Sequence, residues 1–136
     1  MAKSTIDNAL TRAIAQCQNA DLEEEGGVIL RHPDKAYMFV KIRNANTGKP
    51  LARGLWTADR AEFGKKVIPT FKDGWTVHAS FHTHPQFSIN PSRIDMTELF
   101  MGFPINYIYG NQIKQLARYT WVEKGVSVRQ ELVPYE

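Results

Sequence analysis

The hydrophobic positions of the chain begin with a helical pattern. Between residues 4 and 19, apolar residues recur every three or four positions: Ile6, Leu10, Ile14 and Cys17. This spacing puts them on one face, so residues 4–19 are predicted to form an amphipathic helix. Ser4 and Asp7 have the spacing of a capping box at its start.

Beyond residue 25 the pattern changes to short apolar or alternating runs, separated by Gly, Pro, Asn and Asp, which is typical of strands. The first two runs, residues 28–30 and 36–43, are joined by turn residues and predict a hairpin. Further strands are predicted over residues 51–57, 75–82, 105–109, 113–122 and 126–133.

Two more helices are predicted between these strands. Thr57 or Asp59 can cap a short helix that runs through Phe63, and residues 92–101 form another, ended by Gly102. Helices and strands mixed in this order predict an α/β or α+β fold, a mixed sheet flanked by helices. Because we find no repeat or linker, residues 1–136 are expected to form a single domain.

Composition supports a globular protein held together by its core. The chain has 136 residues, of which 43% are hydrophobic and 23% are charged, values ordinary for a soluble domain. Cys17 is its one cysteine, which excludes a disulfide framework and a metal site made of cysteines. Cys17 lies on the apolar stripe of the first helix, so we expect it to be a small core residue.

Charge and hydropathy bear on partners and location. The net charge is +3, and the basic residues are scattered rather than gathered on one stripe, so no nucleic-acid partner is expected. The N-terminal residues lack the apolar run of a signal peptide, and no run has membrane-spanning length. We therefore expect a cytoplasmic protein without membrane contact, with secretion by a signal-free route left open.

Residues 75–84 place polar side chains along one face of a predicted strand. Side chains alternate between faces, so His78, Ser80 and His82 fall on the same face. His84 joins them if the strand geometry continues. His78 lies about 13 Å from His82 at the rise of a strand, so we expect it to be structural or to support the site indirectly.

His82, His84 and a carboxylate at Asp95 form a candidate metal-binding set. Two imidazoles on one face and a carboxylate returned by a loop give three nitrogen and oxygen ligands. Three protein ligands leave the fourth tetrahedral position open to water, which is the arrangement of a catalytic zinc site. The pattern therefore indicates a metal-dependent hydrolase.

These residues also resemble the motif of a known family. His82-Thr83-His84-Pro85, seven residues between His84 and Ser92, and two more before Asp95 resemble the signature of the JAMM (MPN+/JAB) metalloproteases. These enzymes are zinc isopeptidases that include deubiquitinases. The family also requires a glutamate before an upstream strand, and Glu24 takes that place. The order of elements fits over nearly the whole chain.

The resemblance implies a cytidine-deaminase-like JAB/MPN fold of the compact bacterial JAB-like type. It implies one Zn²⁺ per chain, held by the metal ligands His82, His84 and Asp95. Glu24 would be the general base, with Glu25 as its rival because a register shift of one residue would exchange them. Ser92 would donate a hydrogen bond to the oxyanion. Ser92 and Asp95 also have the spacing of a capping box, a structural role compatible with catalysis.

The predicted function is that of a zinc-dependent metallopeptidase or isopeptidase. By resemblance, it would hydrolyse an amide or isopeptide bond in a protein or peptide substrate, including one that carries a ubiquitin-like protein. Two alternatives stay open: a non-catalytic MPN-type scaffold, and a toxin or effector module that acts on a foreign protein. The sequence does not decide the substrate, the linkage, the metal used in the cell or the oligomeric state.

Overall fold

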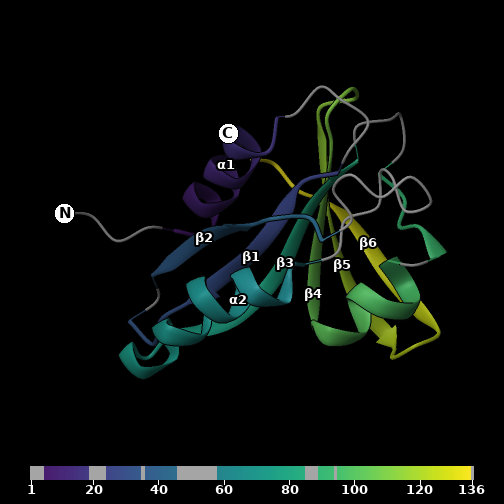
Figure 1. Cartoon of the computed structure of the whole chain (residues 1–136). Helices are drawn as coiled ribbons and strands as arrows, with labels where there is room; N and C mark the ends of the chain where they lie inside the picture. The colour runs from purple at the N-terminus through teal and green to yellow at the C-terminus, as the bar shows by residue number, and fades with distance from the viewer. Residues whose placement is uncertain are drawn as a thin grey trace.

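A six-stranded mixed sheet organises the chain, in the order β2-β1-β3-β4-β5-β6 (Figure 1). The computed structural model describes residues 5–18, 24–34, 36–45, 58–84, 89–93 and 95–135. The strands are β1 (Gly26–Arg31), β2 (Tyr37–Ile42), β3 (Thr76–His84), β4 (Ile105–Gly110), β5 (Gln115–Glu123) and β6 (Ser127–Leu132). β3 and β4 pair in parallel, and the other neighbouring pairs are antiparallel. The predicted α+β fold with a mixed sheet is confirmed, while the strand predicted over residues 51–57 lies outside the described residues.

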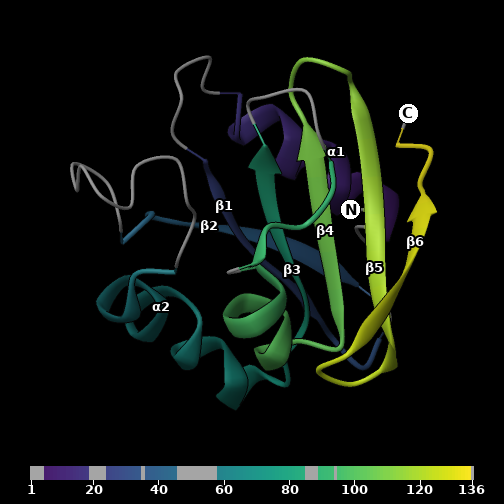
Figure 2. The ribbon, with the colours of Figure 1, turned by 90° about the vertical axis from the view of Figure 1, so that its right-hand side faces the viewer.

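The helix α1 (Ile6–Gln16) covers one face of the sheet (Figure 2). It begins at Thr5, whose hydroxyl accepts a hydrogen bond from the backbone N–H of Asn8, at 3.1 Å. The predicted cap Ser4 lies outside the described residues. The apolar face of α1 packs against inward-facing residues of the strands, including Ile29, Phe39, Phe81 and Tyr107.

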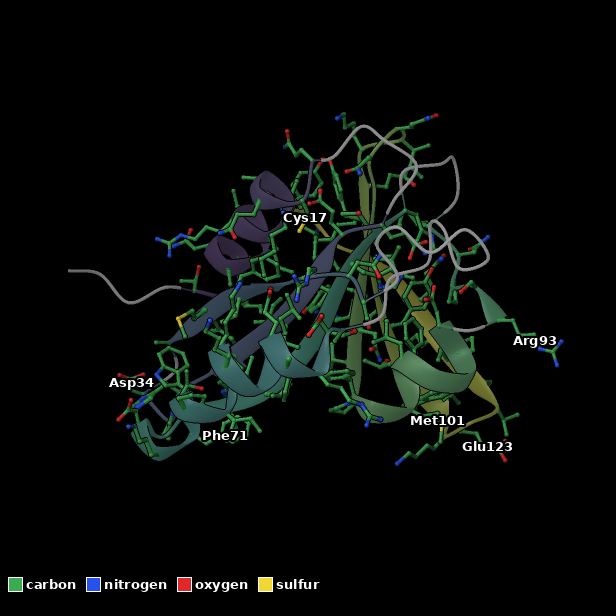
Figure 3. All side chains as sticks on the ribbon, viewed as in Figure 1. Cys17, Asp34, Phe71, Arg93, Met101 and Glu123 are labelled. Carbon is green, nitrogen blue, oxygen red and sulfur yellow. The ribbon has the colours of Figure 1, made fainter. Side chains whose placement is uncertain are left out.

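Cys17 lies at the end of α1 and points toward the sheet (Figure 3). Its side chain is buried in the cluster under α1. Burial raises the pKa of the Cys17 thiol to about 12, and the charge of Glu25 adds to this effect. The thiol is therefore protonated at neutral pH and packs as a small hydrophobic group, as the helical pattern predicts.

Short helical segments cover the other face of the sheet (Figure 2). They are α2 (Arg60–Lys66), the 3₁₀ helix η2 (Ile68–Asp73), the π-helical turn η3 (Asp95–Leu99) and the 3₁₀ turn η4 (Phe100–Gly102). α2 and η2 bury Val67 over Val28 and Leu30 of β1, whereas η4 buries Phe100 over Ile108 of β4. None of the helices in the described ranges has the length and apolar character needed to cross a membrane.

A register shift in β3 changes the face on which His78 lies. Ile29 pairs with Ala79 and the next residue, Leu30, pairs with Val77, so His78 occupies an irregularity in the ladder. Its ring packs edge-on against Tyr37, which belongs to the α1 side of the sheet. The prediction that strict alternation puts His78 on the face of His82 is wrong, because a bulge adds one residue and reverses the alternation.

The pairing of β1 with β2 leaves no room for a side chain at Gly27. A Cβ atom built on Gly27 would lie 2.1 Å from the carbonyl oxygen of Val40, whereas one on Gly64 in α2 would meet nothing within 4 Å. We therefore expect Gly27→Ala to lower the free energy of unfolding by about 1–3 kcal/mol, the usual cost of overpacking. Urea denaturation followed by circular dichroism measures the change.

Gly64→Ala is the matched control for this substitution. Gly64 lies inside a helix with open space around it, so the same added methyl group should raise the free energy of unfolding by up to about 1 kcal/mol. Changes of the same sign in both variants would contradict the close approach of β1 and β2 at Gly27.

Candidate metal centre

Two histidines at the end of β3 bring their ring nitrogens close together. His82 is fully buried and His84 is 8% exposed. β3 keeps its pairing with β4 up to His84, which lies opposite Gly110, so the alternate residues His82 and His84 share one face. Their Nε2 atoms are 3.1 Å apart. The strand that was expected to end at residue 82 therefore extends far enough to bring both imidazoles to one point.

The Asp95 carboxylate meets the two histidines from the segment after β3. Its Oδ2 atom lies 3.2 Å from the Nε2 atoms of both His82 and His84, and the residue is only 2% exposed. Burial by itself raises the pKa of Asp95, but hydrogen bonds from His82 and His84 outweigh it, and the pKa falls well below its ordinary value. The carboxylate is therefore ionised, the form in which a carboxylate can bind a cation.

Ser92 and Asp95 form the capping box that their spacing predicts. The backbone N–H of Asp95 donates to Oγ of Ser92 at 3.0 Å, and the backbone N–H of Ser92 donates to Oδ2 of Asp95 at 2.9 Å. The neighbouring Arg93 projects away from the protein (Figure 3). Instead of the regular helix predicted over residues 92–101, the chain forms the turns η3 and η4.

Glu24 reaches the same point from the segment before β1. Its Oε2 atom lies 3.5 Å from Nε2 of His84, and its Oε1 atom lies 3.9 Å from Nε2 of His82. This segment runs beside β3, because the N–H of Thr83 donates to the carbonyl oxygen of Glu25 at 2.8 Å. The buried Asn44 donates its side-chain amide to the carbonyl oxygen of Glu24, at 3.0 Å. Backbone contacts on two sides therefore direct the Glu24 carboxylate to the histidines.

Glu25, the alternative to Glu24, points in another direction. Its Oε2 atom lies 2.6 Å from Nζ of Lys41 on β2, in an ion pair that is partly exposed. Successive side chains of an extended chain point to opposite faces, so only one of the two glutamates can face the histidines. The observed register gives that position to Glu24.

Ser80 and Asn106 form a polar pair that is buried on the same face of the sheet as His82. The sequence did not lead us to predict this pair. Ser80, fully buried on β3, donates its hydroxyl to the side-chain carbonyl of Asn106 on β4. The amide of Asn106 donates to the carbonyl oxygen of Phe103, at 3.1 Å. A single asparagine within an otherwise apolar strand was the available signal, because a buried amide requires hydrogen-bond partners.

The four converging side chains suit a divalent cation. Their donor atoms, from Glu24, His82, His84 and Asp95, all lie within 4.8 Å of one another. Bonds of about 2.0–2.1 Å at tetrahedral angles set zinc ligand atoms about 3.3 Å apart. The three separations among the two imidazoles and Asp95 are 3.1, 3.2 and 3.2 Å. The carboxylate oxygens of Glu24 lie slightly further from the imidazole nitrogens, at 3.5 and 3.9 Å. At this distance Glu24 can contact a water molecule that occupies the fourth position.

The fold of this chain has counterparts among solved structures. None of the curated proteins matches the chain. The solution structure of a protein from Desulfitobacterium hafniense superposes with a TM-score of 0.68 at 19% identity, covering 96% of this chain and 90% of that one. A protein from Salinibacter ruber gives a TM-score of 0.60 at 20% identity, covering 96% and 88%. At these identities, the likeness shows the fold alone.

The family is shown by the sequence itself. Residues 7–123 match the family model described as prokaryotic homologs of the JAB domain. This range includes most of the sheet and all four residues of the candidate metal site. The resemblance to the compact bacterial JAB-like type is thus confirmed, and the chain belongs to the prokaryotic homologues of the JAB domain.

Proposed function

We propose that the protein is a zinc-dependent hydrolase that cleaves an amide or isopeptide bond in a protein or peptide substrate. The observation that supports this most is the convergence of two imidazole nitrogens and a buried carboxylate oxygen within 3.1–3.2 Å, with a second carboxylate beside them. Two nitrogens and one oxygen are a usual ligand set for catalytic zinc. Membership of the JAB-domain homologues is consistent with this chemistry.

In this proposal His82, His84 and Asp95 hold one Zn²⁺ per chain. When bound, the cation supplies a Lewis acid that polarises the carbonyl and makes water nucleophilic at neutral pH. The residues keep the ligand geometry fixed, because His82 and Asp95 are almost completely buried and packed. The ionised Asp95 partly balances the charge of the cation.

Glu24 acts as general base and then as general acid. Its carboxylate accepts a proton from the attacking water and later delivers that proton to the nitrogen of the leaving amine. The C–N bond breaks, a C–O bond forms, and the products are a carboxylic acid and an amine. With its oxygens 3.5 and 3.9 Å from the two imidazoles, Glu24 lies close enough to serve both transfers.

Ser92 stabilises the oxyanion that develops on the attacked carbonyl. Its Oγ atom accepts the N–H of Asp95, which leaves the hydroxyl proton available for donation. The capping box fixes the Oγ atom close to the ligand Asp95. A single donor of this kind contributes about 10²–10³ in rate.

We propose a lysine side-chain amide as the bond that is cut, with a ubiquitin-like protein as the acyl group. The support is the resemblance of the motif from His82 to Asp95 to the JAMM isopeptidases. A flexible lysine side chain can bring its amide to a recessed metal, whereas a main-chain amide requires a longer stretch of extended peptide.

Metal content tests the ligand set. We expect His84→Ala to lose its bound zinc, because one of three ligands is removed, while the fold is kept. His78→Ala is the matched control, since His78 packs against Tyr37 on the other face of the sheet. Zinc is measured by elemental analysis of the purified proteins after dialysis against micromolar zinc.

The outcome separates ligand roles from general effects of losing a histidine. Near-stoichiometric zinc in the wild type and in His78→Ala, with none in His84→Ala, is the expected result. Zinc retained in His84→Ala, or absent from the wild type, would sink the assignment of the metal site.

A pair of charge-neutralising substitutions tests the base. Glu24→Gln should keep zinc and lose at least about 10²-fold in the rate of isopeptide hydrolysis, because no group can accept the proton. Glu25→Gln removes the same charge one residue away, where the carboxylate pairs with Lys41 instead of facing the histidines. We expect it to keep the rate within a few-fold in a fluorogenic lysine-isopeptide assay, and equal losses in both variants would contradict the role of Glu24.

A further inference from the structure

The segment that carries Asp95 is attached at two points to β5. Near its start, the hydroxyl of Tyr119 donates a hydrogen bond to the carbonyl oxygen of Ile89, at 2.7 Å. After η3, the indole N–H of Trp121 donates to the carbonyl oxygen of Phe100, at 3.1 Å. Tyr119 and Trp121 are two residues apart on one strand and so share a face. Asp95, the third proposed ligand, therefore lies between the two points at which its segment is attached to β5. β5 itself carries no proposed ligand.

Tyr119 is built into the core around its hydroxyl group. The residue is 2% exposed, and its ring packs against Phe100 with centroids 5.6 Å apart. The side-chain amide of Gln130 on β6 donates to the hydroxyl oxygen at 2.5 Å and also lies 3.3 Å from Oδ1 of Asn90. Burial raises the pKa of Tyr119, and the charge of Asp95 acts in the same direction. The hydroxyl therefore stays protonated and donates a hydrogen bond to the carbonyl oxygen of Ile89.

Ile89 also packs against β4, the strand next to β3. Its side chain is 8% exposed, in the cluster that includes Ile108. A Cβ atom built on Gly110 would lie 2.9 Å from Cγ2 of Ile89, so the two residues are in close contact. Gly110 pairs with His84 in the parallel ladder. Ile89 is thus held between the neighbour of a metal ligand and the hydroxyl of Tyr119.

We propose that Tyr119 is a positioning residue for the metal centre: by fixing Ile89, its hydroxyl sets the approach of the Asp95 carboxylate to the two histidines. The inference rests on the proposed function, because it concerns the same ligand set. Metal sites need their ligands within about 0.5 Å of the productive geometry. Tyr119 itself does not touch the ligand atoms and acts through the backbone of the site segment.

Tyr119→Phe tests this role, because it removes the hydroxyl and keeps the ring that packs on Phe100. Titration with Co²⁺ gives the affinity and, through the d–d absorption bands, the coordination geometry. We expect about ten-fold weaker binding, the lower end of the effect of losing a group that orients a metal ligand. The d–d bands should also change in shape, which a general loss of stability would not cause.

Hydrogen exchange gives a measurement that does not depend on metal. The backbone N–H groups of Ser92 and Asp95 are each bonded within the capping box. In the metal-free Tyr119→Phe protein we expect these two amides to exchange several-fold faster than in the wild type. The amides of β3 should exchange as before.

Two further variants serve as controls. Tyr107→Phe removes the hydroxyl of another buried tyrosine, one that lies on the α1 side of the sheet, away from the histidines. It should leave cobalt affinity, spectrum and exchange as in the wild type. Gln130→Leu keeps the bond from Tyr119 to Ile89 and removes the amide that supports the Tyr119 hydroxyl and contacts Asn90. It should move all three measurements in the same direction by a smaller amount.

The results distinguish this inference from the proposed function. Unchanged affinity, spectrum and exchange in Tyr119→Phe would overturn the positioning role and leave the metal site standing. A wild type that binds neither Co²⁺ nor Zn²⁺ would overturn the proposed function. In that case, faster exchange in Tyr119→Phe would still support the anchoring of the segment by Tyr119. Unchanged exchange would overturn this anchoring as well.

Discussion

The buried carboxylate of Asp95 is the constraint on which the rest of the site depends. Removing a charged carboxylate from water costs several kcal/mol unless partners replace the lost solvation. Asp95 is 2% exposed, and its Oδ2 atom has the imidazoles of His82 and His84 and the N–H of Ser92 as partners. These groups come from β3 and from the segment after it. The carboxylate is therefore stabilised where the two meet, and a cation bound there would complete the balance of charge.

The sheet allows this arrangement because its two faces carry different kinds of side chain. The face under α1 is apolar and buries Ile29, Phe39 and Phe81 in one cluster. The opposite face carries Val28 and Leu30 under α2, and toward the other end of β3 it carries His82 and His84. The irregularity at residue 78 reverses the alternation of β3, so that Val77 lies on this opposite face together with Ser80 and His82.

The segment from Ile89 to Phe100 combines a local and a long-range device. The capping box between Ser92 and Asp95 is local, and it orients the serine hydroxyl and the Asp95 carboxylate together. The bonds from Tyr119 and Trp121 are long-range, and they place that local unit against the sheet. A π-helical turn follows, a geometry often found where a helix is adapted to a functional site.

Much of the fold could be predicted from the sequence. The helix α1 and the six strands of the sheet lie close to their predicted ranges, because each has an apolar, amphipathic or alternating pattern that local sterics enforce. The 92–101 helix was predicted from its cap and its glycine, but its turns are distorted, because Phe100 must reach the core beside Ile108. The reversal at His78 could not be predicted, since a bulge depends on how two distant strands pair.

For the site, the sequence by itself determined which residue types are available and their spacing: His82, His84, Ser92 and Asp95 form a motif that indicates a metal site. Only the tertiary structure decided between Glu24 and Glu25, because the choice depends on the register of β1 against β3, which no local pattern contains. It also decided that Tyr119 holds the segment of Asp95, a contact that joins residues 30 positions apart. Long-range pairing sets such contacts, because they arise from the packing of the whole sheet rather than from the preferences of neighbouring residues.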